Sequence, residues 1–145
     1  MIDNILDQLA RDEGFKDTPY KDTRGFSTVG YGHNLDAHPL LNEVYPMAQA
    51  RAKEILQADL AVIDAKLYHD LPWVSDLADV YKGVLQNLSF NMGVEGLLEF
   101  KNTLALIHTG EYPQAAKELL NSLWAKQVGN RAVRVATQLR TNQWV

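Results

Sequence analysis

The sequence contains no cysteine and no long run of hydrophobic residues. Without cysteine the chain forms neither disulfides nor a thiolate metal site, so redox conditions do not restrict its compartment. No stretch approaches the roughly 18 consecutive apolar residues of a membrane-spanning helix. The first residues, Met-Ile-Asp-Asn-Ile-Leu-Asp-Gln, lack the basic start and apolar core of a secretory signal peptide. We therefore expect no signal peptide and no stable membrane insertion.

Common metal, nucleotide and hydrolase motifs are also missing. The histidines are scattered and have no His-x-x-x-His spacing or neighbouring acidic cluster: His33, His38, His69 and His108. Gly30-Tyr31-Gly32 is not followed by Gly-Lys-Ser/Thr, which excludes a P-loop, and no serine lies in a Gly-x-Ser-x-Gly turn. We expect no metal and no cofactor, and we interpret His33 as structural, paired with an acid such as Asp59.

Charge is unevenly distributed along the 145 residues, whose formal net charge is −4. Residues 1–100 contain 8 Lys and Arg against 16 Asp and Glu, a net charge of −8, whereas residues 101–145 contain 6 against 2, a net charge of +4. The last third of the chain therefore suits an anionic partner. Peptidoglycan, with its peptide carboxylates, and nucleic acid both fit, and charge alone does not choose between them.

The stretch from Arg11 to Asn34 carries the most specific pattern. A helix is predicted over residues 2–13, because its apolar residues recur at helical spacing; Asp3 or Asn4 would cap it and Gly14 would end it. A four-residue turn from Asp22 to Gly25 joins two short aromatic and β-branched runs, which predicts a hairpin over about Pro19–Gly32. One carboxylate thus lies at a helix end and another at a hairpin turn, with the hydroxyl of Thr28 on the returning strand.

Two carboxylates in different environments suit the cleavage of a glycosidic bond. One protonates the leaving oxygen, and the other directs water or attacks the sugar. The negative end of a helix favours the protonated form of Glu13, whereas backbone N–H groups and solvent in a polar turn keep Asp22 ionised. The pattern indicates Glu13 as the acid and Asp22 as the second carboxylate.

The rest of the chain reads as helices separated by short breaks. Residues 35–46 contain prolines and read as a loop. Thr103 and Asn130 are expected to cap the helices that follow them. Helices are predicted over 47–68, over 77–92 with Gly93 ending it, over 113–124, and from residue 131 onward.

The quoted residues resemble a known family. Glu13-Gly14, Tyr20-Lys21-Asp22-Thr23, Gly25, Thr28, Gly30 and Gly32-His33 are similar to the catalytic signature of the phage T4-type lysozymes, glycoside hydrolase family 24. The resemblance continues through Phe90-Asn91-Met92-Gly93 to Arg140-Thr141-Asn142-Gln143-Trp144. It implies that Glu13 is the general acid, that Asp22 acts on water with inversion at the anomeric carbon, and that Thr28 helps to hold this water.

The resemblance also implies substrate-binding residues: Gly32, Phe90, Thr103 and Arg131. For Phe90, a place in the hydrophobic core is an equal alternative. Arg131 matches a family arginine that lies near the catalytic glutamate. Glu118 falls where the family's best-known member has a neutral amide that contacts substrate, so we do not assign it.

The implied fold is α+β, predominantly helical, and two-lobed. A single lysozyme domain over 1–145 would contain a small hairpin lobe (14–46), a connecting helix (47–70) and a helical lobe (1–13 and 71–145). The implied function is an endolysin-type muramidase, a monomer that cleaves the β-1,4 bond between N-acetylmuramic acid and N-acetylglucosamine. It would stay in the host cytoplasm until a holin opens the way to the periplasm and cell wall.

Three other functions remain as alternatives. A peptidoglycan-binding or virion structural relative without activity predicts a broken catalytic set, yet Glu13, Asp22 and Thr28 are all present. A lytic transglycosylase needs a single acid and leaves Asp22 and Thr28 unexplained. A nucleic-acid-binding helix-turn-helix would use the turn at Val128-Gly129-Asn130 and the basic residues Arg131, Arg134 and Arg140, but it leaves the Glu13–Thr28 stretch without a purpose.

Overall fold

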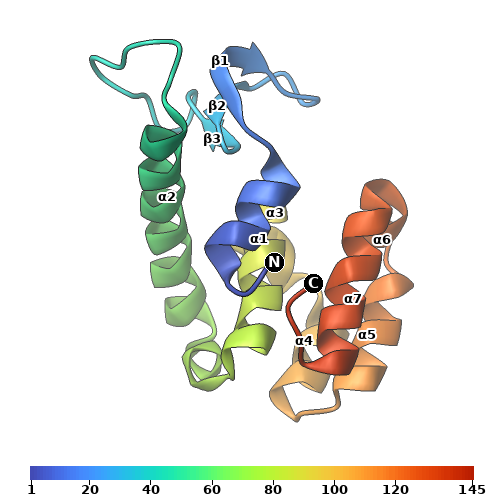
Figure 1. Cartoon of the computed structure of the whole chain (residues 1–145). Coiled ribbons are helices and arrows are strands. Elements are labelled where there is room, and N and C mark those ends of the chain that lie inside the picture. Colours follow the sequence, from blue (N-terminus) through green and yellow to red (C-terminus); the bar gives the residue numbers. More distant parts are fainter. The chain divides into compact units, whose positions relative to one another are not determined.

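The computed structural model describes all 145 residues and is 63% helical (Figure 1). The expected predominantly helical α+β fold is confirmed. None of the helices has the length and apolar character that crossing a membrane requires. The elements are α1 (Ile5–Glu13), β1 (Lys16–Lys21), β2 (Ser27–Gly30), β3 (His33–Asn34), α2 (Gln49–Asp70), the 3-10 helix η1 (Pro72–Asp76), α3 (Asp79–Leu98), α4 (Lys101–His108), α5 (Tyr112–Leu120), α6 (Leu123–Val128) and α7 (Asn130–Thr141).

The chain divides into two compact units. The helical unit comprises Met1–Gln8 and Ile63–Val145, and the sheet unit comprises Leu9–Val62. Along the sequence, α1 begins in the helical unit and ends in the sheet unit. The helix α2 begins in the sheet unit and ends in the helical unit. Both stretches of chain that pass between the units are therefore helical.

In the helical unit, α3 to α7 enclose a hydrophobic core. The helix α5 packs against α4 and α7, as Figure 1 shows in orange and red. Aliphatic side chains from each of α3, α4, α5 and α7 are fully buried in this core, among them Leu85, Leu88, Ile107, Leu119 and Leu139. Burying an aliphatic side chain of this size contributes about 1.5–3 kcal/mol. The apolar residues that recur at helical spacing in the sequence are therefore the ones that face this core.

Several predicted helix ends differ from the structure. The segment predicted as one helix over 113–124 is divided: α5 ends at Leu120, and Ser122 caps α6 by accepting a hydrogen bond from the N–H of Ala125 at 3.1 Å. Thr103 and Asn130 do not cap α4 and α7: the cap positions are Phe100 and Gly129, and neither helix has a side-chain cap. The side chain of Thr103 is instead buried by tertiary packing, which outweighs its local capping preference.

Other predicted boundaries agree with the structure. Asn4 caps α1 by accepting the N–H of Asp7 at 2.9 Å, and Gly14 takes the left-handed conformation, with φ of 72°. Gly93 interrupts the helical geometry of α3, with φ of 79° and ψ of 158°. These residues act on backbone groups close to them in the chain, which is why the sequence predicts them.

In the sheet unit, the three strands form an antiparallel sheet in the order β1-β2-β3. Tyr20 pairs with Thr28 across the β1–β2 hairpin, and the N–H of Gly25 donates to the carbonyl of Asp22 at 3.0 Å, which closes the predicted turn. Pro19 is accommodated because β1 is an edge strand. Buried side chains of the sheet and of α2 form the interior of this unit, among them Val29, Tyr31, Ile55 and Leu56.

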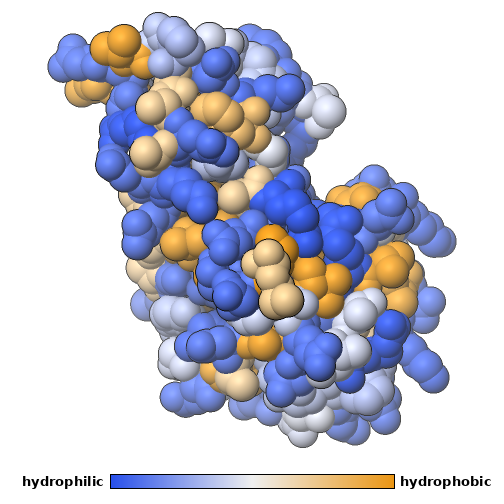
Figure 2. Space-filling model, viewed as in Figure 1, coloured by the Kyte–Doolittle hydropathy of each residue, from blue (hydrophilic) through white to orange (hydrophobic).

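The predicted loop over 35–46 is confirmed and extends to the start of α2. Two of its hydrophobic side chains are exposed, Leu41 at 84% and Val44 at 79%. Figure 2 shows orange, hydrophobic atoms at the upper left, where Figure 1 draws this loop. Apart from this loop, the visible surface of the sheet unit is mostly hydrophilic.

Candidate active site

Glu13 is the last residue of α1, and the backbone of Gly32 lies directly against its carboxyl group. A β-carbon added to Gly32 would lie 2.9 Å from Oε2 and 3.1 Å from Cδ of Glu13. Gly32 also has φ of 71°, a conformation that other residues rarely adopt. A glycine is therefore required here both by the close approach of Glu13 and by the backbone geometry.

Asp22 is held in the hairpin turn by one of its two carboxylate oxygens. Its Oδ1 accepts the backbone N–H groups of Arg24 and Phe26, both at 2.9 Å. No protein group donates to Oδ2. The two N–H donors set the direction of the carboxyl group. The turn therefore presents a fixed carboxyl group with one oxygen available.

Thr28 lies on β2, directly opposite Tyr20 on β1. Its residue is only 4% exposed, and Oγ1 donates to the carbonyl of Phe26 at 3.0 Å. Because the hydroxyl proton is used in that bond, the lone pairs of Oγ1 remain as acceptors. Tyr20, Asp22 and Thr28 share one face of the hairpin, since side chains two residues apart on a strand point the same way.

Tyr20 lies close to both carboxylates. Its pKa is raised first by burial and then by the negative charges of Glu13 and Asp22. Glu13 and Asp22 therefore both lie near the phenol of Tyr20. Tyr20 is on the hairpin face that also carries Thr28.

His33 is buried in the sheet unit and holds two elements together. Its Nδ1 lies 2.7 Å from Oδ2 of Asp59, and its Nε2 lies 2.7 Å from the carbonyl of His38. The pKa of His33 is raised mainly by the hydrogen bond with Asp59, against the opposing effect of burial. The predicted pairing of His33 with Asp59 is confirmed, and it ties β3 to α2.

The predicted site residues do not all belong to one unit. Glu13, Asp22, Thr28 and Gly32 lie in the sheet unit, whereas Phe90, Thr103 and Arg131 lie in the helical unit. Phe90 is half-buried on α3.

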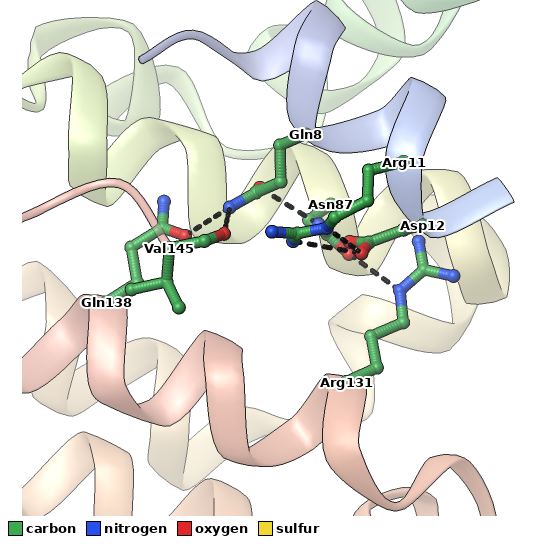
Figure 3. A network of polar contacts seen from close by, with 7 residues as sticks. All are labelled: Gln8, Arg11, Asp12, Asn87, Arg131, Gln138 and Val145. Carbon is green, nitrogen blue, oxygen red and sulfur yellow. Dashed lines mark hydrogen bonds and ion pairs between the residues drawn. The ribbon is translucent and has the colours of Figure 1, made fainter. Parts of the chain in front are cut away.

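Arg131 is buried in the helical unit and takes part in a series of hydrogen bonds (Figure 3). Its Nε donates to Oδ1 of Asn87 at 3.0 Å, Nδ2 of Asn87 donates to Oε1 of Gln8 at 2.9 Å, and Nε2 of Gln8 donates to Oε1 of Gln138 at 2.6 Å. Nε2 of Gln138 then donates to the carbonyl of Val80 at 2.7 Å. Each amide donates in the same direction, so the whole series orients the guanidinium.

Thr103 lines a pocket of about 540 Å³ between α4 and α5, which we call the α4–α5 pocket. It is lined by residues 99–103, from the end of α3 into the first turn of α4, and by Glu118, Asn121 and Ser122 at the end of α5. The pocket brings Thr103 and Glu118 together. Its volume falls within the range of small-molecule sites.

Sequence reasoning missed the hydrogen-bonded amides and the charged lining of the pocket. Gln86 and Asn87 interrupt an otherwise apolar helical stretch, which is the only local signal that a buried polar network exists there. Gln8 and Gln138 have no comparable signal, because their partners are 130 residues apart in the chain. Lys101 and Glu99 read in the sequence as ordinary surface charges. In the whole structure, no group of three or more His, Asp or Glu side chains is placed to hold a metal ion.

Comparison with known proteins gives one family. The family model described as phage lysozyme matches residues 10–142. The chain is 32% identical to "Probable T4-type lysozyme 1" of Dictyostelium discoideum, over 97% of this chain and 96% of that protein. It is 28% identical to "Probable T4-type lysozyme 2" of the same organism, over 97% and 96% of the two chains. It is also 28% identical to the "Pre-baseplate central spike protein Gp5" of Enterobacteria phage T4, over 95% of this chain and 28% of that protein.

Proposed function

The chain belongs to the phage lysozyme family and is a lysozyme-type glycoside hydrolase, and on this premise we propose that it is a muramidase acting through Glu13, Asp22 and Thr28. The bond it cleaves is the β-1,4 linkage from N-acetylmuramic acid to N-acetylglucosamine in bacterial peptidoglycan. The observation that supports this most is the state of Asp22, whose Oδ1 is held by two backbone N–H groups while Oδ2 has no protein donor.

Asp22 and Thr28 have complementary roles toward one water molecule. Oδ2 of Asp22 accepts one hydrogen of the water, and Oγ1 of Thr28, whose own proton is given to the Phe26 carbonyl, accepts the other. A water that donates both hydrogens in this way turns its lone pair toward the anomeric carbon. As the C–O bond breaks, the proton of the water passes to Asp22.

Glu13 supplies the proton to the leaving oxygen. Its position at the negative end of α1 favours the protonated acid, and the backbone of Gly32 limits where its carboxyl group can lie. The water attacks from the side opposite the leaving group, so the expected product has an inverted anomeric configuration. One proton is gained by Asp22 and one is lost by Glu13 in each turnover, and exchange with solvent restores both.

Mass spectrometry of fragments released from purified peptidoglycan tests this proposal. Wild type should release fragments with a hydrated N-acetylmuramic acid at the reducing end, and proton NMR of fresh product should show the inverted anomer. Glu13→Gln should release none while keeping the wild-type circular dichroism spectrum. Asp17→Asn, on the exposed edge strand of the same hairpin, is the matched control and should retain activity.

Three other results would contradict the proposal. Anhydro products would indicate a transglycosylase. Turnover by a folded Glu13→Gln protein would remove Glu13 from the mechanism. The similarity to a baseplate spike protein supports a second candidate, a peptidoglycan-binding part of a virion, and binding without any release by wild type would favour it.

A further inference from the structure

Two tyrosine rings of the helical unit are stacked face to face. Tyr81 lies near the start of α3 and Tyr112 is the first residue of α5. Their ring centroids are 3.7 Å apart, with an angle of 7° between the ring planes. Aromatic pairs usually prefer an offset or edge-to-face arrangement, with centroids roughly 4.5–7 Å apart. The surrounding packing therefore holds these two rings closer together, and more directly over each other, than the rings themselves favour.

A second stack fixes the chain just before Tyr112. Trp73 of η1 lies parallel to His108 at the end of α4, with ring centroids 4.4 Å apart and an angle of 5° between the planes. The turn that follows α4 is closed by the N–H of Glu111, which donates to the carbonyl of Leu106 at 2.8 Å. The tyrosine stack therefore lies at a junction whose backbone is held on both sides.

The two phenol groups lie near each other. The pKa of Tyr112 is raised first by burial and then by the negative charge of Tyr81, which is an effect of short distance between the phenol oxygens. Neither hydroxyl makes a hydrogen bond within the protein. Both side chains are half-buried and pack on the edge of the core. Each phenol can therefore give its proton to solvent when its ring loses an electron.

The stack is unique among the six tyrosines of the chain. No other two tyrosine rings are in contact, and the ring beside Tyr31 is that of Phe15. The chain has no cysteine, so no disulfide can join its helices and no thiol competes for an oxidant. A covalent bond between two helices of this protein must therefore use other side chains, and the stack is the place where two oxidisable rings touch.

We propose that Tyr81 and Tyr112 form an oxidative cross-linking site, at which a one-electron oxidant joins α3 covalently to α5. Each phenol gives one electron to the oxidant and one proton to solvent, which leaves two tyrosyl radicals in contact. A carbon–carbon bond then forms between the ring carbons next to the hydroxyl groups, and the hydrogen on each of these carbons moves to the phenol oxygen. The oxidant is a haem iron or another metal complex in a high oxidation state, two of which are each reduced by one electron.

The product is a covalent link within the helical unit. The new bond closes the part of the chain between positions 81 and 112, which lowers the entropy of the unfolded chain as a disulfide would. The joined rings no longer lie parallel, and because both are half-buried they can rotate toward solvent. This inference does not depend on the proposed function, since neither tyrosine is among the candidate site residues.

Oxidation of the full chain in dilute solution tests the proposal. Photo-oxidised ruthenium tris-bipyridine is a suitable oxidant, because it is small and takes one electron at a time. Wild type should give a monomeric product with dityrosine fluorescence and a mass lower by two hydrogen atoms. Tryptic digestion should yield the peptides 67–82 and 102–117 joined to each other, and fragment spectra should place the bond at Tyr81 and Tyr112. In urea the stack is lost, so the yield of this product should fall.

Paired variants assign the cross-link. Tyr81→Phe and Tyr112→Phe keep a ring in each place but have no phenol to oxidise, and each should lose the intramolecular product. Tyr68→Phe is the matched control, because Tyr68 is half-buried and lies in the same tryptic peptide as Tyr81 but contacts no tyrosine ring; it should cross-link as wild type does. The thermal unfolding midpoint of cross-linked wild type should rise by about 5–10 °C, and that of oxidised Tyr112→Phe should not.

A folded wild-type protein that forms no intramolecular dityrosine would overturn the inference. A product that persists in Tyr81→Phe or Tyr112→Phe, or that forms equally well in urea, would also overturn it, because such a product does not come from the stack. An unfolding midpoint that does not rise in the cross-linked protein would reject the link as a stabilising bond between α3 and α5.

Discussion

The sheet unit and the helical unit hold their polar side chains in different ways. In the sheet unit, Asp22 is held by backbone N–H groups two and four residues further along the chain. In the helical unit, Arg131 is oriented by Asn87, 44 residues away, and the series continues through Gln8 and Gln138 across separations of 79 and 130 residues (Figure 3).

The two units therefore orient a polar side chain in two different ways. A turn that supplies its own hydrogen bonds orients a carboxylate with little dependence on distant packing. A series of buried amides orients a guanidinium only when every member is in place, because each amide that loses a partner leaves a buried polar group unsatisfied. Substitutions in the hairpin should therefore change chemistry more than stability, and substitutions in the amide series should change stability first.

The largest expected effect is on activity, from Asp22→Asn. Asparagine keeps Oδ1, so the two N–H bonds and the turn should persist, but Nδ2 replaces the oxygen that accepts a proton from water. We expect kcat to fall about 10²–10⁴-fold, while the free energy of unfolding changes by less than about 0.5 kcal/mol. Fragment release and urea unfolding measure the two quantities. An active Asp22→Asn protein would remove the proposed role of Asp22, and a large loss of stability would remove the contrast between the units.

The next effect is on stability, from Gln8→Leu and Gln138→Leu. Gln8→Leu leaves the amide of Asn87 without its acceptor and Gln138 without its donor, which should lower the free energy of unfolding by about 2–4 kcal/mol. The double variant should lose less than the sum of the singles, with a coupling of about 0.5–3 kcal/mol. Gln127→Leu, at an exposed position on α6, is the control. Strictly additive losses in urea unfolding would show that the amides do not act as one series.

A smaller effect, dependent on pH, is expected from Asp59→Asn. The folded pKa of His33 is raised above its unfolded value, first by the hydrogen bond with Asp59, so the protonated form stabilises the fold. This stabilisation is fully present below the unfolded pKa, about 6.5, and is lost as pH rises through the folded pKa. The difference between wild type and Asp59→Asn should therefore be about 1–3 kcal/mol in mildly acidic buffer and smaller in alkaline buffer.

Thermal unfolding across this pH range measures the difference. Asp70→Asn is a matched control, because the neighbouring His69–Asp70 pair is exposed to solvent and should contribute little. A difference for Asp59→Asn that grows with rising pH would contradict the assignment of the His33–Asp59 pair as a stabilising contact of the protonated histidine.

The smallest expected effect is from the cap of α1. Asn4→Ala removes the acceptor of the Asp7 N–H and should cost about 1 kcal/mol. Asp3→Ala, one residue earlier, should cost less, because Asp3 accepts only from the exposed amide of Asn4. Equal losses in urea unfolding would show that the cap does not depend on the specific hydrogen bond to Asp7.

The features predicted correctly have partners close by in the chain. The cap at Asn4, the left-handed Gly14 and the Asp22–Gly25 turn each close within four residues, so residue type and spacing are enough to find them. The predictions that Thr103 and Asn130 cap helices were wrong, because contacts distant in the chain decided the conformation there. Their local preference was clear, but tertiary packing of α4 and the conformation of Gly129 decided otherwise.

The candidate site residues also divide into those with local contacts and those with distant ones. The order Glu13, Asp22, Thr28 can be read in one stretch of sequence, and the family resemblance assigns roles to it that remain proposals. Nothing in the sequence joins residues 99–103 with Glu118, since they meet only because α4 packs on α5.

By itself, the sequence determined the helices, the hairpin and the orientation of Asp22, because hydrogen bonds between near neighbours depend on few residues and small losses of chain entropy. Only the tertiary structure decided which buried amides meet Arg131 and which residues line the α4–α5 pocket with Thr103. Those contacts join residues tens of positions apart. Packing of whole helices and sheets selects them, and no local pattern encodes that packing.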